Sequence, residues 1–137
     1  MAIWQVALYL TSKKHIDISN PAFESSLKKL EMFFTETKSW CKNIKQYGEL
    51  DSTCIEIDID SYDDISVRID LRSISKNQLT AILDFALDND LCIKYNDNIY
   101  ETCMESFVSI FRESDANKFL LCPEKFLKET SERNLSN

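Results

Sequence analysis

Two short segments of strictly alternating polarity set the architecture of this chain: Cys54-Ile-Glu-Ile-Asp-Ile-Asp60 and Ile65-Ser-Val-Arg-Ile-Asp-Leu-Arg72. Successive side chains of a β-strand point to opposite faces, so this alternation predicts two strands that are apolar on one side and polar on the other. The residues between them, Ser61-Tyr-Asp-Asp64, are typical of a turn. The sequence therefore predicts a β-hairpin with one dry face and one wet, highly charged face.

The acids of the wet face are the residues that we expect to meet a partner. They are Glu56, Asp58, Asp60 and Asp70 on the strands, together with Asp63 and Asp64 at the turn. The simplest interpretation is a solvated face whose acids pair with Arg68 and Arg72 across the hairpin. Recognition of a partner protein is a second interpretation, and a metal site on Glu56, Asp58 and Asp60 is a third. The metal site is incomplete because the first strand offers no further acid.

The segments on either side of the hairpin complete an alternating order of strands and helices. Apolar patterns predict strands over 3–10 and 91–95. Helical periodicity and helix-start signals predict one helix from Asn20-Pro21 to about residue 38, and another from Ser75-x-x-Gln78 to about Asn89. The resulting order, β-α-β-β-α-β, predicts an α+β fold: an antiparallel, ferredoxin-like split β-α-β sheet with helices on one face.

The remaining segments are less regular. Residues 39–53 are compatible with either a second short helix or a loop. A capping box at Thr102-x-x-Glu105 predicts a C-terminal helical segment, and the apolar Phe119-Leu-Leu-Cys122 predicts a short strand or extended stretch. Without linkers or repeats, we expect one α+β domain over 1–128 and a polar C-terminal tail over 129–137.

Composition narrows the possible partners. The formal net charge of −7 argues against direct binding of nucleic acid, because phosphate contacts need clustered Lys and Arg. It either favours a basic protein partner or only maintains solubility. The only glycine is Gly48, which excludes glycine-rich phosphate loops, so we expect no nucleotide or other cofactor. His15 is the only histidine and leaves no obvious base for a nucleophile; we therefore expect no catalytic residues and no enzyme activity.

The sequence also carries expectations about location. The N-terminal segment lacks the basic start of a signal peptide, and no run approaches the roughly 18 apolar residues of a membrane helix. The five cysteines lack a C-x-x-C pair, which favours free, reduced thiols and no metal site. We therefore expect a cytoplasmic protein without a membrane partner.

Several residues together resemble a known class of proteins. They are Trp4 in the first strand, Gly48 followed by Asp51, the run Ile65-x-Val-Arg-Ile-Asp-Leu-Arg72, the later Ser114-x-Ala116-x-x-Phe119, and Pro123-x-x-Phe-Leu127. This pattern is similar to small bacterial immunity proteins encoded beside polymorphic toxins, including those of contact-dependent growth inhibition systems. The resemblance covers most of residues 3–127.

The resemblance implies a function without catalysis. An immunity protein binds a cognate toxin C-terminal domain, often a basic nuclease, and blocks its active site or substrate path. The six acids named above would be the partner-binding residues, with Asp84, Asp88 and Asp90 as an alternative epitope. A metal-dependent enzyme using Glu56, Asp58 and Asp60, or an acidic adaptor protein, are the alternatives, and the sequence leaves the oligomeric state open.

Overall fold

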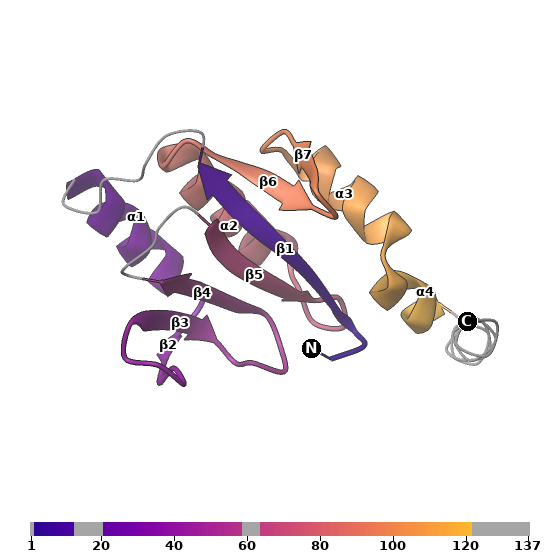
Figure 1. Ribbon diagram of the computed structural model, residues 1–137, viewed down its shortest axis with the longest axis horizontal. Coiled ribbons are helices and arrows are strands. Elements are labelled where there is room, and N and C mark those ends of the chain that lie inside the picture. The colour runs from indigo at the N-terminus through magenta and orange to yellow at the C-terminus, as the bar shows by residue number, and fades with distance from the viewer. Residues whose placement is uncertain (1, 13–20, 59–63, 122–137) are drawn as a thin grey trace.

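The protein folds around one open antiparallel sheet (Figure 1). The computed structural model describes residues 2–12, 21–58 and 64–121. The elements are β1 Gln5–Ser12, α1 Pro21–Glu31, β2 Glu36–Thr37, β3 Ile44–Gly48, β4 Cys54–Asp58, β5 Asp64–Asp70, α2 Lys76–Asp88, β6 Leu91–Tyr95, β7 Asn98–Tyr100, α3 Met104–Glu113 and α4 Asp115–Leu121. The strands lie in the order β2-β3-β4-β5-β1-β6-β7.

The predicted ferredoxin-like arrangement is the centre of this sheet. Strands β4, β5, β1 and β6 are neighbours and antiparallel, and α1 and α2 provide the two crossovers. The β-α-β-β-α-β order predicted from the sequence is therefore confirmed. Strands β2 and β3 widen the sheet beyond β4, and β7 widens it beyond β6.

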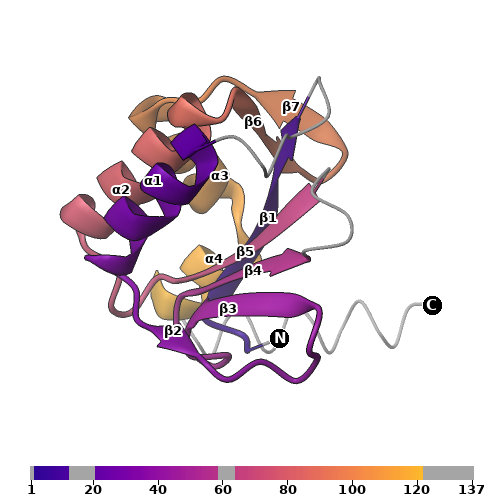
Figure 2. The same ribbon diagram turned by 90° about the vertical axis from the view of Figure 1, so that its left-hand side faces the viewer.

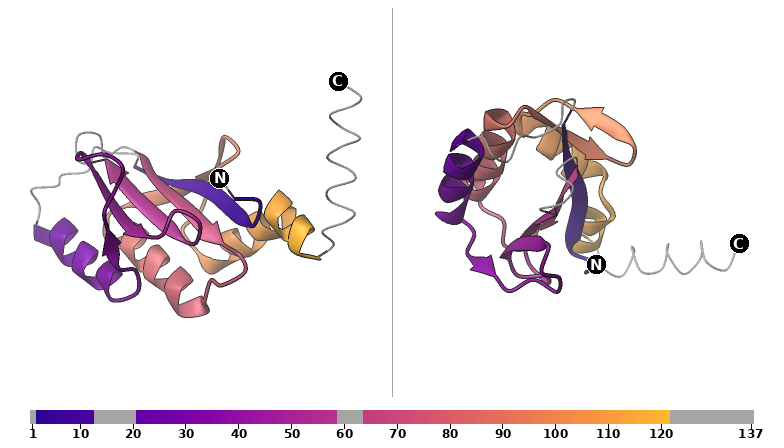
Figure 3. Two further views of the ribbon diagram at one scale, coloured as in Figure 1. Left: turned by 90° about the horizontal axis from the view of Figure 1, so that it is seen from below. Right: turned by 60° about the vertical axis from the view of Figure 1, so that its left-hand side comes forward.

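The helices lie on one side of the sheet. Figure 2 shows α1 and α2 against a single face, and the view from below in Figure 3 shows the helices coloured purple, pink and orange, α1, α2 and α3, on that side. The face beneath them is apolar: Val6, Leu8 and Leu10 of β1 are buried, as are Ile55 and Ile57 of β4. The side chains of β5 that alternate onto this face, Ile65, Val67 and Ile69, are fully buried as well. The predicted dry face is confirmed.

The hairpin forms in the predicted place. Strand β4 pairs with β5 so that Glu56 lies opposite Ser66, and β5 pairs along its whole length with β1. Helix α2 starts with the predicted capping box, in which the Ser75 hydroxyl accepts from the Gln78 amide at 3.1 Å. These local signals and the long-range pairing agree, which is typical of sequences that specify one fold.

The segment between α1 and β4 contains strands that the sequence did not reveal. Helix α1 ends at Glu31 instead of near residue 38, and the open question over 39–53 resolves into β3 preceded by a turn. Strand β3 lacks clean alternation because adjacent residues Gln46 and Tyr47 are both buried. The Gln46 side chain lies on the other face of the sheet, where its Nε2 donates to the Thr37 hydroxyl at 2.9 Å.

Two predictions for the C-terminal part were wrong. Thr102 does not cap α3, because its hydroxyl donates to the Leu91 carbonyl at 2.6 Å. The N-cap is Cys103, whose side chain makes no capping bond to the backbone of the helix. Phe119 lies in helix α4, and not in a strand, because the chain restarts a helix after Ser114. The Ser114 hydroxyl accepts from the Asn117 amide at 3.1 Å, which supports that restart.

Some residues named above fall outside the described part of the chain: the tail over 129–137, the motif Pro123-x-x-Phe-Leu127, His15, Asp60, Asp63 and Cys122. In the described part of the chain, no helix has both the length and the apolar character needed to cross a membrane.

Gly48 occupies a position that only glycine tolerates. Its φ of 87° lies in the left-handed region, and a Cβ there would collide with the backbone carbonyl oxygen of Thr53. Replacing Gly48 by Ala should therefore lower the free energy of unfolding by more than about 1 kcal/mol in urea titrations. Lys45→Ala, on the same strand but exposed, should stay within about 0.5 kcal/mol of the parent. Equal stability of the two variants would contradict the close approach of Thr53.

The buried face gives a second stability prediction. Ile69→Ala should lower the free energy of unfolding by about 2–5 kcal/mol, because Ile69 is fully buried between the sheet and the helices. Ile99→Ala removes the same atoms from a side chain that is 57% exposed, and should change stability by less than about 0.5 kcal/mol. Similar losses in both variants would mean that the two faces are assigned the wrong way round.

Candidate functional site

The side of the sheet opposite the helices, here called the open face, is where the sequence places its acids (Figure 1). Directly paired residues on neighbouring strands share a face, so the register identifies each row of side chains. One row crosses the whole sheet and consists of Thr37, Gln46, Glu56, Ser66, Tyr9, Lys94 and Ile99. This row mixes one acid with a lysine, polar groups and two large apolar side chains, so the open face is amphipathic instead of uniformly acidic.

Glu56 is the best-positioned acid of this face. Its carboxylate accepts from the Trp40 indole N–H at 3.0 Å and lies 3.7 Å from the guanidinium of Arg68. The Glu56 side chain is 10% exposed, whereas that of Arg68 is 33% exposed. The ion pair predicted between an acid of β4 and Arg68 of β5 is therefore confirmed, and its basic member is the more accessible one.

Large side chains stand out from the open face on either side of this ion pair. Trp40 is 72% exposed although its indole N–H is tied to Glu56, and Tyr9 is 47% exposed on the central strand. Ile99 lies further along the same row, beyond Lys94. Aromatic residues beside an arginine are the side chains most often found at the energetic centre of protein–protein interfaces.

The other predicted acids whose side chains the structure describes are Asp58 and Asp70, and their surroundings differ. Asp58 lies on the open face opposite Ile44 and is half-buried, with an interaction partner of its own. Asp64 contributes its backbone to the pairing with Thr11. Asp70 is 1% exposed, so its carboxylate is buried and does not reach the surface. The rest of the predicted set, Asp60 and Asp63, lies outside the described residues.

Asp70 belongs to a cluster at one end of the sheet. Arg72 binds its carboxylate with two hydrogen bonds, Nε to Oδ1 at 3.0 Å and Nη2 to Oδ2 at 2.9 Å. The guanidinium also stacks 3.7 Å from the centre of the Trp4 ring, and the Trp4 indole donates to the Asp51 carbonyl at 2.9 Å. Gln5 secures the same loop by donating to the carbonyls of Leu50 and Ser52.

This end cluster contains several of the residues that carry the resemblance. Trp4, Asp51 and Arg72 meet there, and Gly48 lies at the end of β3 just before the same loop. Their contacts hold the loop 49–53 against β1 and β5. The shared pattern is therefore built largely from residues that shape this end of the fold.

Other candidates for chemistry do not converge. Among the residues that the structure describes, no group of three His, Cys, Asp or Glu side chains could hold a metal ion. The described cysteines are free, and Cys54 is buried on the open-face side of β4. Burial, with the Glu56 carboxylate adding to it, raises the pKa of the Cys54 thiol to about 11, which opposes thiolate chemistry.

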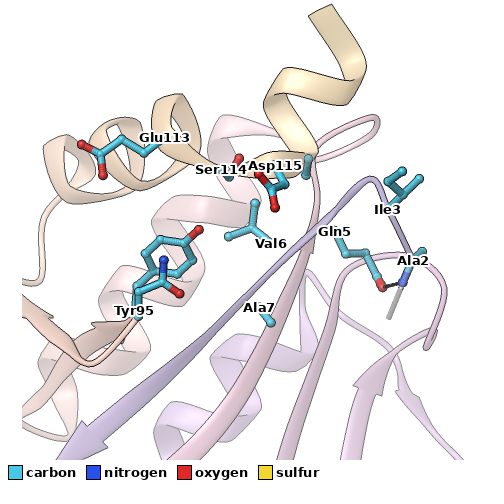
Figure 4. A pocket seen from close by; sticks show the side chains of 11 residues that line it. Ala2, Ile3, Gln5, Val6, Ala7, Tyr95, Glu113, Ser114 and Asp115 are labelled. Carbon is cyan, nitrogen blue, oxygen red and sulfur yellow. Dashed lines mark hydrogen bonds between the residues drawn. The ribbon is translucent and has the colours of Figure 1, made fainter. Parts of the chain in front are cut away.

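A pocket of about 550 Å³ lies beside the first half of β1, where β6 has already ended (Figure 4). Its lining comes from Ala2, Ile3 and residues 5–7 near the N-terminus, from Tyr95 and Asn96 at the end of β6, and from the junction of α3 with α4. Tyr95, Glu113 and Asp115 are the ionisable residues of this lining. We call it the edge pocket.

Sequence analysis overlooked most of these accessible residues. Trp40 lies in the irregular stretch whose structure the sequence left open, although a lone tryptophan among polar residues is itself a signal of an exposed aromatic. Glu113 and Asp115 lie on either side of the Ser114 break, and only the packing of α4 beside β1 brings them to the sheet edge.

The Asp70–Arg72 pair predicts a pH dependence of stability. Burial alone would raise the pKa of Asp70, but the hydrogen bonds from Arg72 outweigh it and hold that pKa below its ordinary value. A carboxylate with a lower pKa in the folded state stabilises the fold above its unfolded pKa, about 3.9, and loses that contribution as the pH falls through the folded value. Asp70→Asn should therefore lower the free energy of unfolding by about 1–3 kcal/mol at pH 7.

The difference between the parent and Asp70→Asn should shrink when urea titrations are repeated near pH 2. Asp84→Asn, at an exposed position of α2, should stay within about 0.5 kcal/mol of the parent at both pH values. A cost of Asp70→Asn that is the same at both pH values would rule out the ionised pair as its source.

Comparison of the whole sequence with protein-family models, with curated proteins and with solved structures found no match to any of the three. The function of this chain is therefore to be inferred from its own residues and from the surfaces described above.

Proposed function

We propose that this chain is a noncatalytic immunity-type inhibitor, which binds a cognate toxin domain through the open face and blocks it. The observation that carries the proposal is the pair of exposed aromatic side chains, Trp40 and Tyr9, beside the Glu56–Arg68 ion pair on the face opposite the helices. The resemblance to immunity proteins agrees with it.

The chemistry of the open face suits a protein partner. Trp40 and Tyr9 offer large, stiff apolar area with a polar edge, which loses little conformational entropy on binding. Tying the Trp40 indole to Glu56 restricts the ring before a partner arrives, so less ordering is left for the complex to supply. Arg68 and Lys94 provide donors that orient an incoming acceptor.

The overall charge adds long-range attraction. A formal net charge of −7 speeds encounter with a basic domain, and a nuclease that holds phosphate is such a domain. Charges outside the contact act mainly on the association rate, whereas buried aromatic anchors act on the dissociation rate. The acids thus steer the partner in this proposal, and the residues of the open face hold it.

The first experiment measures binding between the full chain and the C-terminal domain of the protein encoded immediately upstream of its gene. We expect a nanomolar dissociation constant by calorimetry, weaker association at high salt, and loss of that domain's toxicity in co-expressing cells. An upstream domain that neither binds nor is toxic would overturn the immunity proposal.

A second experiment locates the surface. Trp40→Ala and Tyr9→Ala should each raise the dissociation constant at least about tenfold, because each removes an aromatic side chain from the centre of the proposed interface. Leu87→Ala truncates an apolar side chain that is 58% exposed on α2 and should leave the affinity unchanged. Loss of affinity in Asp84→Lys, with both aromatic variants unaffected, would move the interface to the acids of α2.

A further inference from the structure

Among the residues that the structure describes, no strand pairs with the first half of β1 on the side of β6, and we call this stretch the free edge of β1. The partner strand β5 covers Gln5–Thr11, but β6 pairs only with Tyr9–Ser12. Strand β6 stops at Tyr95 because the chain reverses through Asn96 and Asp97, whose φ angles of 48° and 63° are those of a tight type I′ hairpin turn. The edge of β1 beyond this turn adjoins the edge pocket.

The register indicates which backbone groups face the free edge. The Leu71 amide donates to the Trp4 carbonyl at 3.2 Å, so the even-numbered residues of β1 bond to β5. The odd-numbered residues consequently point toward β6, where Tyr9 meets Lys94. Ala7 is exposed and points the same way, past the end of β6, and it has no strand opposite it there among the described residues.

Gln5 is the other residue of this edge, and its N–H is already used. It donates to the Ala2 carbonyl at 3.0 Å, within the turn that leads into β1. The backbone N–H and C=O of Ala7 therefore form the best placed donor and acceptor on this edge, spaced as pairing with an added strand requires.

The edge pocket gives this free edge a chemical preference. Side chains that alternate with Ala7 point to the helix side, as Val6 does, and there the pocket is bounded by Tyr95 and by the junction of α3 with α4. Figure 4 shows Tyr95 with its hydroxyl toward that junction and Asp115 with its carboxylate toward Val6. Glu113 completes the lining, in which the described residues include two carboxylates and no lysine or arginine.

The acids at this site already act on their neighbour. Burial, followed by the charge of Asp115, raises the pKa of Tyr95, so the phenol stays protonated and can donate a hydrogen bond. Negative potential without a basic partner in the lining favours a cation. A lysine or arginine side chain fits this site, because its aliphatic stem can pack against the apolar walls while its charged head meets the carboxylates.

We propose that the edge pocket binds an extended, lysine- or arginine-bearing peptide segment of a partner protein, which adds to β1 as a short strand in line with β6. The segment pairs its backbone with the N–H and C=O of Ala7. Its residues on either side of that pair project to the helix side, where a basic side chain reaches Asp115, and Glu113, whose carboxylate points away from Asp115, adds to the negative charge of the pocket. This site is separate from the open face, and the proposal stands whether or not the partner is a toxin domain.

The test is a ¹⁵N NMR titration of the full chain with the capped peptide acetyl-Thr-Lys-Thr-Lys-Thr-amide. We expect saturable shifts of the Ala7, Tyr95 and Asn96 amides with a dissociation constant on the order of 1 mM, a strength that a few hydrogen bonds and one ion pair can supply. The matched peptide acetyl-Thr-Glu-Thr-Glu-Thr-amide should bind at least about fivefold more weakly.

Two variants separate the backbone from the charge contribution. The double variant Glu113→Gln with Asp115→Asn should weaken the lysine peptide at least about fivefold, while Glu105→Gln, an exposed acid of α3 outside the pocket lining, should not. Ala7→Pro removes the strand donor and should abolish the shifts; if it fails to fold, the double variant decides. Equal binding of the two peptides, or shifts that avoid Ala7, would overturn the proposal.

Discussion

The pairing of β1 with β5 is the constraint on which the rest of this structure depends. The two strands are antiparallel in the register Gln5 to Asp70 through Thr11 to Asp64, and they lie in the middle of the sheet. A slip of one residue would turn Val6 and Leu8 out of the core and bring Ala7 and Tyr9 in. Because the helices bury one face, the register is strongly specified. The same register fixes what the other face presents and which backbone groups remain at the free edge of β1.

Two surfaces of different character follow from that constraint. The open face is broad and carries aromatic side chains next to a partly covered ion pair, which suits a folded partner. The edge pocket is narrow and offers backbone groups beside carboxylates, which suits a single extended segment. Between them, the loop 49–53 is held by Trp4 and Gln5 and closes one end of the sheet. Of the acids that the sequence suggests as one patch, Glu56 and Asp58 lie on the open face, whereas Asp70 is buried in the cluster at the end of the sheet.

The sequence predicted those parts of the fold in which local pattern and long-range packing agree. The alternation of β4 and β5 was sufficient to predict both strands, and the capping box was sufficient to predict the start of α2, although each signal involves few residues. Strand β3 was not predicted because the polar residue Gln46 is buried in it. The Gln46 side chain donates to Thr37, a partner that only the folded sheet provides. Thr102 was misassigned for a similar reason, since its hydroxyl prefers the distant Leu91 carbonyl to the local helix end. The placement of Asp70 under Arg72 likewise depends on packing at the end of the sheet, and alternation alone cannot distinguish a buried acid from a solvated one.

The burial of Cys54 makes its thiol a native reporter of local opening of the sheet. This thiol lies on the side of β4 that bears Glu56 and Arg68, and it is 1% exposed in the closed sheet. A thiol-specific reagent reaches it only when β4 parts from its neighbours, so the labelling rate at Cys54, followed separately from that of the partly exposed Cys41, Cys92 and Cys103, reports this opening. A partner bound on the open face would lower the labelling rate of Cys54, and denaturant would raise it. A thiol that is buried and unreactive in the native fold thus reports how often this part of the sheet opens.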